Sequence, residues 1–162
     1  IFNDGLLSLH DREAGRFMMG EARVSNFEGL TRLRLKPSDM STLLAGQIPR
    51  LQDQGGEVIW DEVRGRAVLV LKRGIQRQVI SFDQKDTTPR MMALYESEVL
   101  MVRVLLADYS QSEPKLPRQL RVEIPQGEIK VNTTLVDYTL NPRLPEIAFK
   151  IEPPPGLETQ SF

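Results

Sequence analysis

VLMVRVLLA, residues 99–107, carries one charged side chain in nine positions, and so apolar a segment must be covered for most of its length. Three of the nine residues are β-branched, which favours a strand over a helix of equal apolarity. Residues with turn chemistry follow at positions 111–117 and end the segment. The sequence therefore predicts that this stretch forms the central strand of a sheet.

The two faces of this strand differ in character. Successive side chains of a strand point to opposite sides, so the even-numbered residues share one face and the odd-numbered residues share the other. The odd face includes Arg103, whereas the even face carries no charge. We expect the even face to point inward, and it presents four apolar side chains: Leu100, Val102, Val104 and Leu106.

The segments on both sides of the central strand have the pattern of further strands joined by short turns. Gly65, Gly74 and Gly127 stand where tight turns require a positive φ. Short connections favour an antiparallel meander, in which each strand pairs with the next one in the sequence. The strands predicted after residue 56 are 58–61, 66–72, 76–82, 90–95, 99–109, 118–124, 128–135 and 146–152.

The first 50 residues predict a β-hairpin, with strands near 6–9 and 17–20, followed by two short helices. The helices are expected near 26–34 and 38–45, with Gly46 as a left-handed cap that ends the second. An antiparallel sheet with one apolar face must bury that face. We therefore predict a mainly β fold. Its sheet of about eight to ten strands is strongly curved and antiparallel, an incomplete β-barrel with the two helices as a lid over the concave face.

The composition argues against several classes of function. The 21 basic and 22 acidic residues nearly cancel, so nucleic acid is not an expected partner. The chain has no cysteine and one histidine, His10, which lies beside a predicted turn. No metal-binding or phosphate-loop motif is present. We expect no enzyme activity, no metal and no cofactor.

Two carboxylates with neighbouring cations, Asp83 and Asp86 with Lys85 and Arg90, offer an acid–base pair as one interpretation. DQKDTTP, residues 83–89, has instead the composition of a surface connection between strands. Charged residues in such connections usually serve turn geometry and solubility. We therefore interpret this cluster as structural.

LKPSDMSTLLAGQIP, residues 35–49, resembles a helix of LolB-like outer-membrane lipoproteins, in which leucine, proline and an acidic residue precede leucine-leucine-x-glycine-x-isoleucine-proline. Shorter pieces stand in the order associated with such proteins: 108–109, 116–118, 140–142, 149–151 and 154–156. The resemblance implies the fold of the periplasmic lipoprotein carriers LolA and LolB. That fold is an incomplete antiparallel barrel with a helical lid, and its apolar interior accommodates acyl chains.

The resemblance also implies an organisation and a location for the chain. A single LolA/LolB-like half-barrel domain is expected over residues 1–152, with a proline-rich tail over 153–162. The chain begins with Ile1 and a predicted strand follows closely, so we expect the N-terminal strands and any lipid-attachment cysteine to lie upstream. The implied location is the periplasm, with a lipid anchor in the outer membrane.

The leading functional hypothesis is non-enzymatic binding of lipid or lipoprotein acyl chains in the barrel interior, during lipoprotein trafficking to the bacterial outer membrane. The alternative is a structural or assembly module of the cell envelope whose barrel is filled by side chains. An open sheet edge would pair with another envelope protein or with a second copy. The residues expected to line the ligand site are Met40, Leu43, Leu44, Leu100, Val102, Val104, Leu106, Leu120, Val122, Val131, Phe149 and Ile151.

Overall fold

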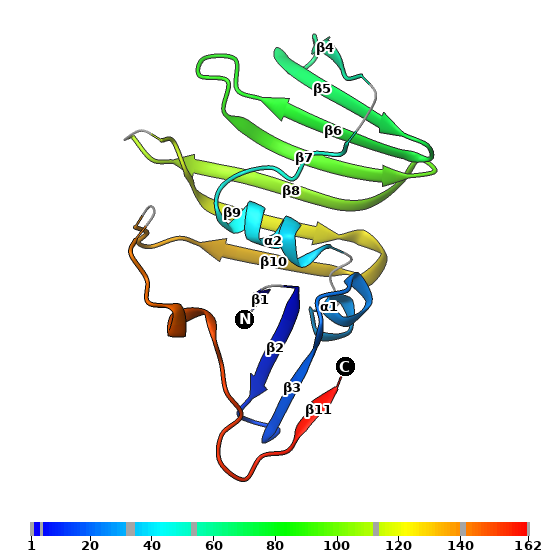
Figure 1. Cartoon of the computed structure of the whole chain (residues 1–162). Helices are drawn as coiled ribbons and strands as arrows, with labels where there is room; N and C mark the ends of the chain where they lie inside the picture. Colours follow the sequence, from blue (N-terminus) through cyan, green and yellow to red (C-terminus); the bar gives the residue numbers. More distant parts are fainter. Residues whose placement is uncertain are drawn as a thin grey trace. The chain divides into compact units, whose positions relative to one another are not determined.

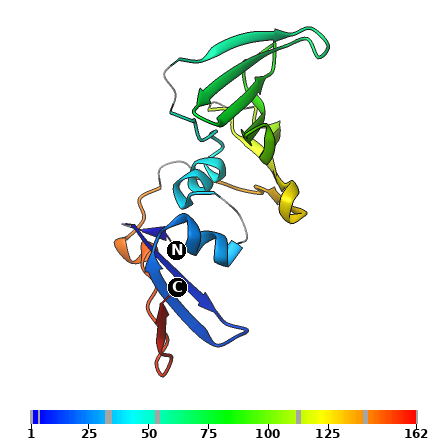
Figure 2. The same ribbon diagram turned by 90° about the vertical axis from the view of Figure 1, so that its right-hand side faces the viewer.

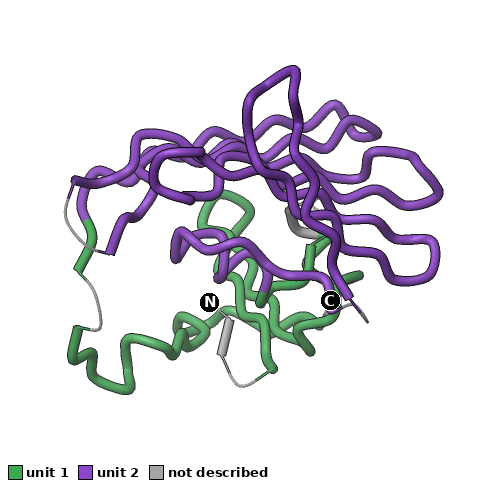
Figure 3. Tube along the Cα trace, turned by 90° about the horizontal axis from the view of Figure 1, so that it is seen from above, with its two compact units in different colours: residues 1–38, 138–162 green, residues 39–137 purple. Residues whose placement is uncertain are grey.

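The structure is a computed structural model, and it describes residues 2–3, 5–31, 35–52, 55–111, 114–139 and 142–161. The chain forms two compact units, each with a sheet of its own. Unit 1 consists of residues 1–38 and 138–162, and unit 2 consists of residues 39–137 (Figure 3).

Unit 2 contains an open antiparallel sheet of seven strands, in the order β10-β9-β8-β7-β6-β5-β4 (Figure 1). Each strand pairs with its neighbour in the sequence, which confirms the predicted meander. Among the described residues, β4 and β10 each have one partner strand, so the sheet is not closed into a barrel. The bounds are β4 Glu57–Asp61, β5 Arg66–Arg73, β6 Gln76–Phe82, β7 Pro89–Glu96, β8 Val99–Tyr109, β9 Pro117–Ile124 and β10 Ile129–Thr134, with a short 3-10 helix, η1 Pro125–Gly127, between the last two.

The inward face of this sheet is the even face of β8, as predicted. Val104 lies between Met92 on β7 and Val122 on β9, and its side chain is 0% exposed. Met92 and Val122 are cross-strand neighbours of Val104 on the same face, and apolar pairs of this kind stabilise a sheet. The other buried apolar residues of this face are Leu71, Ile80, Val102, Leu106, Leu120 and Ile124.

A short helix, α2 Pro37–Leu44, precedes the sheet of unit 2 and ends as the sequence predicts. Gly46 has φ +75°, and the amide of Gln47 donates to the carbonyl of Thr42 over 3.0 Å, the pattern of a Schellman cap. A Cβ atom on Gly46 would lie 2.6 Å from Cδ of Pro117, the first residue of β9. The backbone that ends α2 therefore passes directly against the start of β9.

The segment after α2 is held to the inward face by Gln78 of β6. This side chain is buried, and it donates to the carbonyl of Pro49 over 2.6 Å and accepts from the amide of Leu51 over 2.8 Å. Gln78 pairs with Leu71 and Leu94 and so points to the same side as Val104. The segment from α2 to Leu51 therefore lies over the inward face.

Unit 1 contains a second, smaller sheet in the order β1-β2-β3-β11 (Figure 2). Strands β2 Leu6–Asp11 and β3 Arg16–Glu21 form the predicted hairpin, in which Phe17 is buried. The outer strands are β1 Phe2–Asn3, antiparallel to β2, and β11 Thr159–Ser161, parallel to β3. A helix, α1 Val24–Thr31, follows β3, and positions 32–34 of the predicted first helix lie outside the described residues.

Three expectations need correction. The strand predicted at 146–152 is wrong, because Glu146–Phe149 forms an exposed 3-10 helix, η2. Pro145 precedes η2 and three prolines follow at 153–155, which leaves little room for regular strand pairing. The N-terminal hairpin belongs to its own sheet rather than to the meander. The proline-rich tail ends in strand β11, which was not among the predicted strands.

Candidate functional site

The structure places the twelve residues predicted to line a ligand site in different environments. Five of them form a contiguous buried group on β8 and β9, namely Val102, Val104, Leu106, Leu120 and Val122. Leu43 of α2 is also buried, whereas Met40 and Leu100 are half-buried, and Leu44 and Val131 are exposed. Phe149 and Ile151 lie in unit 1, outside any described strand.

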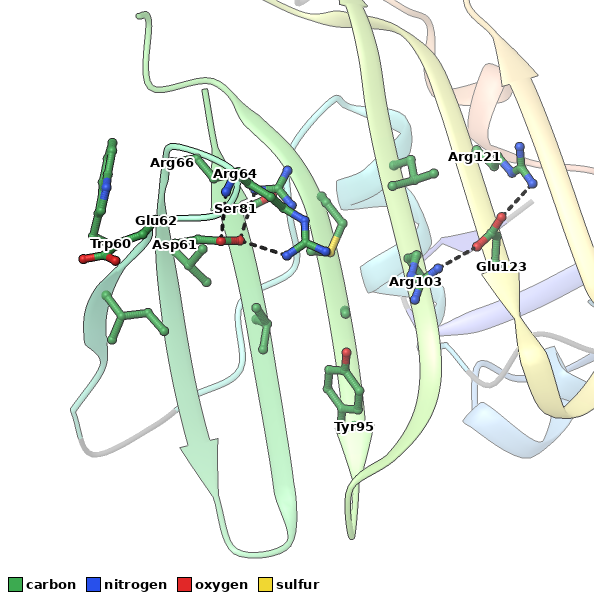
Figure 4. Close-up of a pocket in the computed structure, with 16 residues that line it drawn as sticks. Trp60, Asp61, Glu62, Arg64, Arg66, Ser81, Tyr95, Arg103, Arg121 and Glu123 are labelled. Carbon is green, nitrogen blue, oxygen red and sulfur yellow. Dashed lines mark hydrogen bonds and ion pairs between the residues drawn. The ribbon is translucent and has the colours of Figure 1, made fainter. Parts of the chain in front are cut away.

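A pocket lies on the opposite face of the same sheet and has a volume of about 1010 Å³ (Figure 4). None of the twelve predicted residues lines it. Its floor follows one row of the sheet register, in which Ser81, Met91 and Leu105 stand side by side on β6, β7 and β8. Val79 and Ala93 form the neighbouring row. The middle of the pocket is therefore largely apolar.

One end of the pocket is formed by the β4–β5 hairpin. The carboxylate of Asp61 accepts from NH1 of Arg64 over 3.2 Å and from the Arg64 amide over 3.1 Å. Nε of Arg66 lies 3.8 Å from the same carboxylate. Desolvation alone would raise the pKa of Asp61, but the hydrogen bonds and charges of the two arginines outweigh it and hold the pKa below its usual value. Asp61 is therefore a carboxylate shared by two guanidinium groups.

The other end of the pocket repeats this arrangement on β8 and β9. Glu123 lies 3.6 Å from NH1 of Arg103 and 2.7 Å from NH2 of Arg121 (Figure 4). Across the whole lining, four arginines stand against three carboxylates: Arg64, Arg66, Arg103 and Arg121 against Asp61, Glu62 and Glu123. The pocket therefore combines an apolar middle with two charged ends and an excess of one positive charge over its lining.

Two polar groups that line the pocket lack a hydrogen-bond partner among the described residues. They are Oγ of Ser81, whose side chain is 0% exposed, and Nε of Arg66. A buried donor without an acceptor costs free energy, and such groups are rare in folded proteins. An acceptor at the end of the pocket near Asp61 would satisfy both atoms, since a hydroxyl and a guanidinium Nε each donate a hydrogen bond.

The sequence did not reveal this pocket. Its charged residues occupy polar positions of alternating strands, and such positions ordinarily face solvent. Arg103, the one charge in the apolar stretch 99–107, was the available signal, because Arg121 and Glu123 occur at the matching positions of the next strand. The alternation of apolar and polar residues does not determine which residues of neighbouring strands stand side by side, so it does not predict that Arg66 lies on the same face.

The Asp83–Asp86 cluster has the structural role expected of it. Asp83 accepts from NH2 of Arg90 over 3.0 Å, and Asp86 accepts from Oγ1 of Thr88 over 2.6 Å and from Nζ of Lys115 over 2.9 Å. The Thr88 hydroxyl and then Lys115 are the main causes that hold the pKa of Asp86 well below its usual value. Both carboxylates therefore stay ionised and fix the β6–β7 connection.

We expect the pairing of Asp86 to make stability depend on acid pH. The pKa of Asp86 is lower in the folded chain than its ordinary value of 3.8, so its contribution is present above about pH 4 and is lost as the pH falls through the folded value. Asp86→Asn should lower the urea midpoint at pH 7 and reduce the loss of stability between pH 5 and pH 2. Glu57→Gln, at an exposed carboxylate of β4, is the control and should follow the unmodified chain. Identical pH profiles for Asp86→Asn and the unmodified chain would contradict the pairing.

The described residues contain no group of three histidine, cysteine, aspartate or glutamate side chains placed to hold a metal ion. His10 lies on β2 with its ring centroid 6.4 Å from that of Phe17. Among the helices of the described part of the chain, none has both the length and the apolarity to cross a membrane.

No protein-family model matches the chain, and no curated protein sequence matches it. The fold is similar to that of a crystal structure from Vibrio parahaemolyticus, described as an outer membrane lipoprotein-sorting protein domain. The TM-score is 0.57 at 16% sequence identity, and the likeness covers 88% of this chain and 62% of the other. The chain thus spans less than two thirds of the length of that domain, and the likeness concerns the fold.

Proposed function

We propose that this chain is a non-enzymatic domain that binds acyl chains of lipids or lipoproteins, in lipoprotein trafficking at the bacterial outer membrane. The fold likeness to a lipoprotein-sorting domain is the observation that carries the proposal. The proposal includes a periplasmic location of the domain, with a lipid anchor upstream of Ile1. The open, mainly β architecture with a short helix beside an apolar sheet face agrees with this function.

The proposed ligand site is the inward face of the seven-stranded sheet, with α2 and the segment to Leu51 as its cover. In the described state this face is occupied by the chain's own side chains, and Leu43 of α2 is 1% exposed. An acyl chain would enter when α2 moves aside. Burial of each methylene is worth about 0.8 kcal/mol, so a partly inserted chain gains enough to offset the exposure of a few side chains.

Leu43→Ala tests α2 as a movable cover. The change weakens the closed state, which raises the fraction of molecules with an accessible sheet face and so raises the apparent affinity for a ligand. We expect a fluorescent fatty acid to bind several-fold more tightly, with a loss of unfolding free energy below roughly 2 kcal/mol. Leu144→Ala is the matched control, because Leu144 is 52% exposed and lies in unit 1, outside α2 and the seven-stranded sheet. It should leave both quantities unchanged.

A second candidate function is favoured by the burial of the middle of the inward face. Leu71 and Val104 are 0% exposed, as expected for a structural or assembly module of the cell envelope whose sheet is filled by side chains. Unchanged fatty-acid affinity in Leu43→Ala, together with a core-sized loss of roughly 2–5 kcal/mol, would favour this module over the acyl-chain carrier. Native mass spectrometry that finds no displaceable apolar ligand would point the same way.

A further inference from the structure

We propose that the pocket on the outer face of the seven-stranded sheet binds an anionic amphiphile, a molecule with a phosphate or carboxylate group on a short apolar body. This site is separate from the proposed acyl-chain site, because the residues of its floor and those around Val104 alternate along the same strands and point to opposite sides. Nothing in the proposed carrier function requires it.

The anionic group is placed by two buried polar atoms that make no hydrogen bond, Oγ of Ser81 and Nε of Arg66, the second of which lies 3.8 Å from the Asp61 carboxylate. Ser81 pairs with Val68 across β5 and β6, and Arg66 stands two residues before Val68. The side chains of Ser81 and Arg66 therefore share one face on neighbouring strands. The guanidinium Nε of Arg66 only donates a hydrogen bond and the hydroxyl of Ser81 is able to donate one, so a single acceptor satisfies both atoms. A carboxylate or phosphate oxygen satisfies both donors and gains from the charge of Arg66.

The net positive charge of the lining favours an anion over a cation. Arg64 and Arg66 share the single carboxylate of Asp61, and Arg103 and Arg121 share that of Glu123. Glu62 also lines the hairpin end, so the four arginines and three carboxylates leave an excess of one positive charge over the whole lining. Arginine also forms planar, two-pronged hydrogen bonds with carboxylate and phosphate groups.

The apolar body is placed by the floor between the two ends. Met91 and Leu105 lie in the register row that runs from Ser81 to Arg121. Strands in a sheet are about 4.8 Å apart, so this row extends roughly 14 Å from β6 to β9. Ile59 and Trp60 of β4 add apolar surface at the hairpin. A free inorganic anion would leave this surface unused, which favours an amphiphile.

Trp60 provides a direct measurement, because it is the only tryptophan of the chain and lines the pocket. We expect decyl phosphate, added below its micelle concentration, to produce a saturable change in tryptophan fluorescence. Arg66→Gln should weaken this binding at least tenfold, and Ser81→Ala should weaken it several-fold. Arg73→Gln is the matched control, since Arg73 is an exposed arginine of the same strand outside the pocket. It should bind decyl phosphate like the unmodified chain.

Far-ultraviolet circular dichroism and thermal midpoints are to be measured for each variant, to check that it is folded. Ser81→Ala should be at least as stable as the unmodified chain, because it removes a buried hydroxyl without a partner. Equal affinity of Arg66→Gln, Ser81→Ala and Arg73→Gln for decyl phosphate would overturn the proposal.

Two other probes distinguish the sources of binding. Inorganic phosphate should bind far more weakly than decyl phosphate, and equal affinity would identify a free-anion site instead. Decyl maltoside has the same alkyl chain without the charge, and equal affinity for it would show that the anionic group contributes nothing. Leu43→Ala should not alter the Trp60 response to decyl phosphate. These measurements therefore test the pocket on the outer face independently of the acyl-chain site.

Discussion

Val104→Glu is expected to remove roughly 4–5 kcal/mol of unfolding free energy, a large part of the roughly 5–15 kcal/mol of a typical domain. Val104 is 0% exposed between Met92 and Val122, so the new carboxylate would be desolvated among apolar side chains. Burial raises the pKa of such a carboxylate above its unfolded value. The penalty should therefore grow as the pH rises through the raised pKa and shrink toward pH 4. Urea unfolding followed by circular dichroism at both pH values measures it.

Ala107→Glu is the control for this variant. Ala107 lies on the same strand but is exposed, so the same carboxylate remains in water and the change should stay within about 0.5 kcal/mol. If Val104→Glu also retained fatty-acid binding and near-normal stability, the inward face of β8 would be neither core nor ligand site.

Gly46→Ala is expected to cost roughly 2–4 kcal/mol, more than a change of one methyl group ordinarily does. The residue has φ +75°, a conformation that L side chains avoid, and its new Cβ would lie 2.6 Å from the ring of Pro117. Proline has no flexible end that swings away, so either α2 or the start of β9 must shift. Equilibrium unfolding gives the loss, and fatty-acid binding by the same variant shows whether the position of α2 matters for the ligand.

Gly74→Ala separates the two causes. Gly74 has φ +58° in the β5–β6 turn, but no atom lies within 4 Å of its Cβ position, so only the backbone cost of about 1–2 kcal/mol applies. A loss for Gly46→Ala no greater than that for Gly74→Ala would mean that α2 does not approach β9 as described.

The seven-stranded meander could be predicted from the sequence because its signals are local. The alternation of apolar and polar residues indicated which face of each strand is buried, and the glycines at 65 and 74 indicated the turns. The end of α2 at Gly46 was predictable for the same reason, since a left-handed cap after an apolar helical stripe is a short-range pattern.

Other elements were not predictable, because they depend on distant partners. TQS, residues 159–161, is polar and carries no alternation, and it becomes a strand by pairing with β3. Conversely, FKI at 149–151 alternates like a strand, yet no partner strand pairs with it among the described residues. For the same reason the pocket was not predictable, since its residues come from six strands, β4 to β9, and the register of those strands decides which side chains are neighbours.

The parallel pairing of β11 with β3 has a consequence for the order of folding. Phe17 and Thr159 are register partners, and the loop between them contains the whole of unit 2. Closing so long a loop is entropically unfavourable while the intervening chain is still unfolded. We therefore expect the hairpin-linked strands of unit 2 to form early and the pairing of β3 with β11 to form last. During synthesis, that edge of the N-terminal hairpin would stay unpaired until residue 161 had left the ribosomal exit tunnel. An unpaired strand edge is a binding site for chaperones during this period.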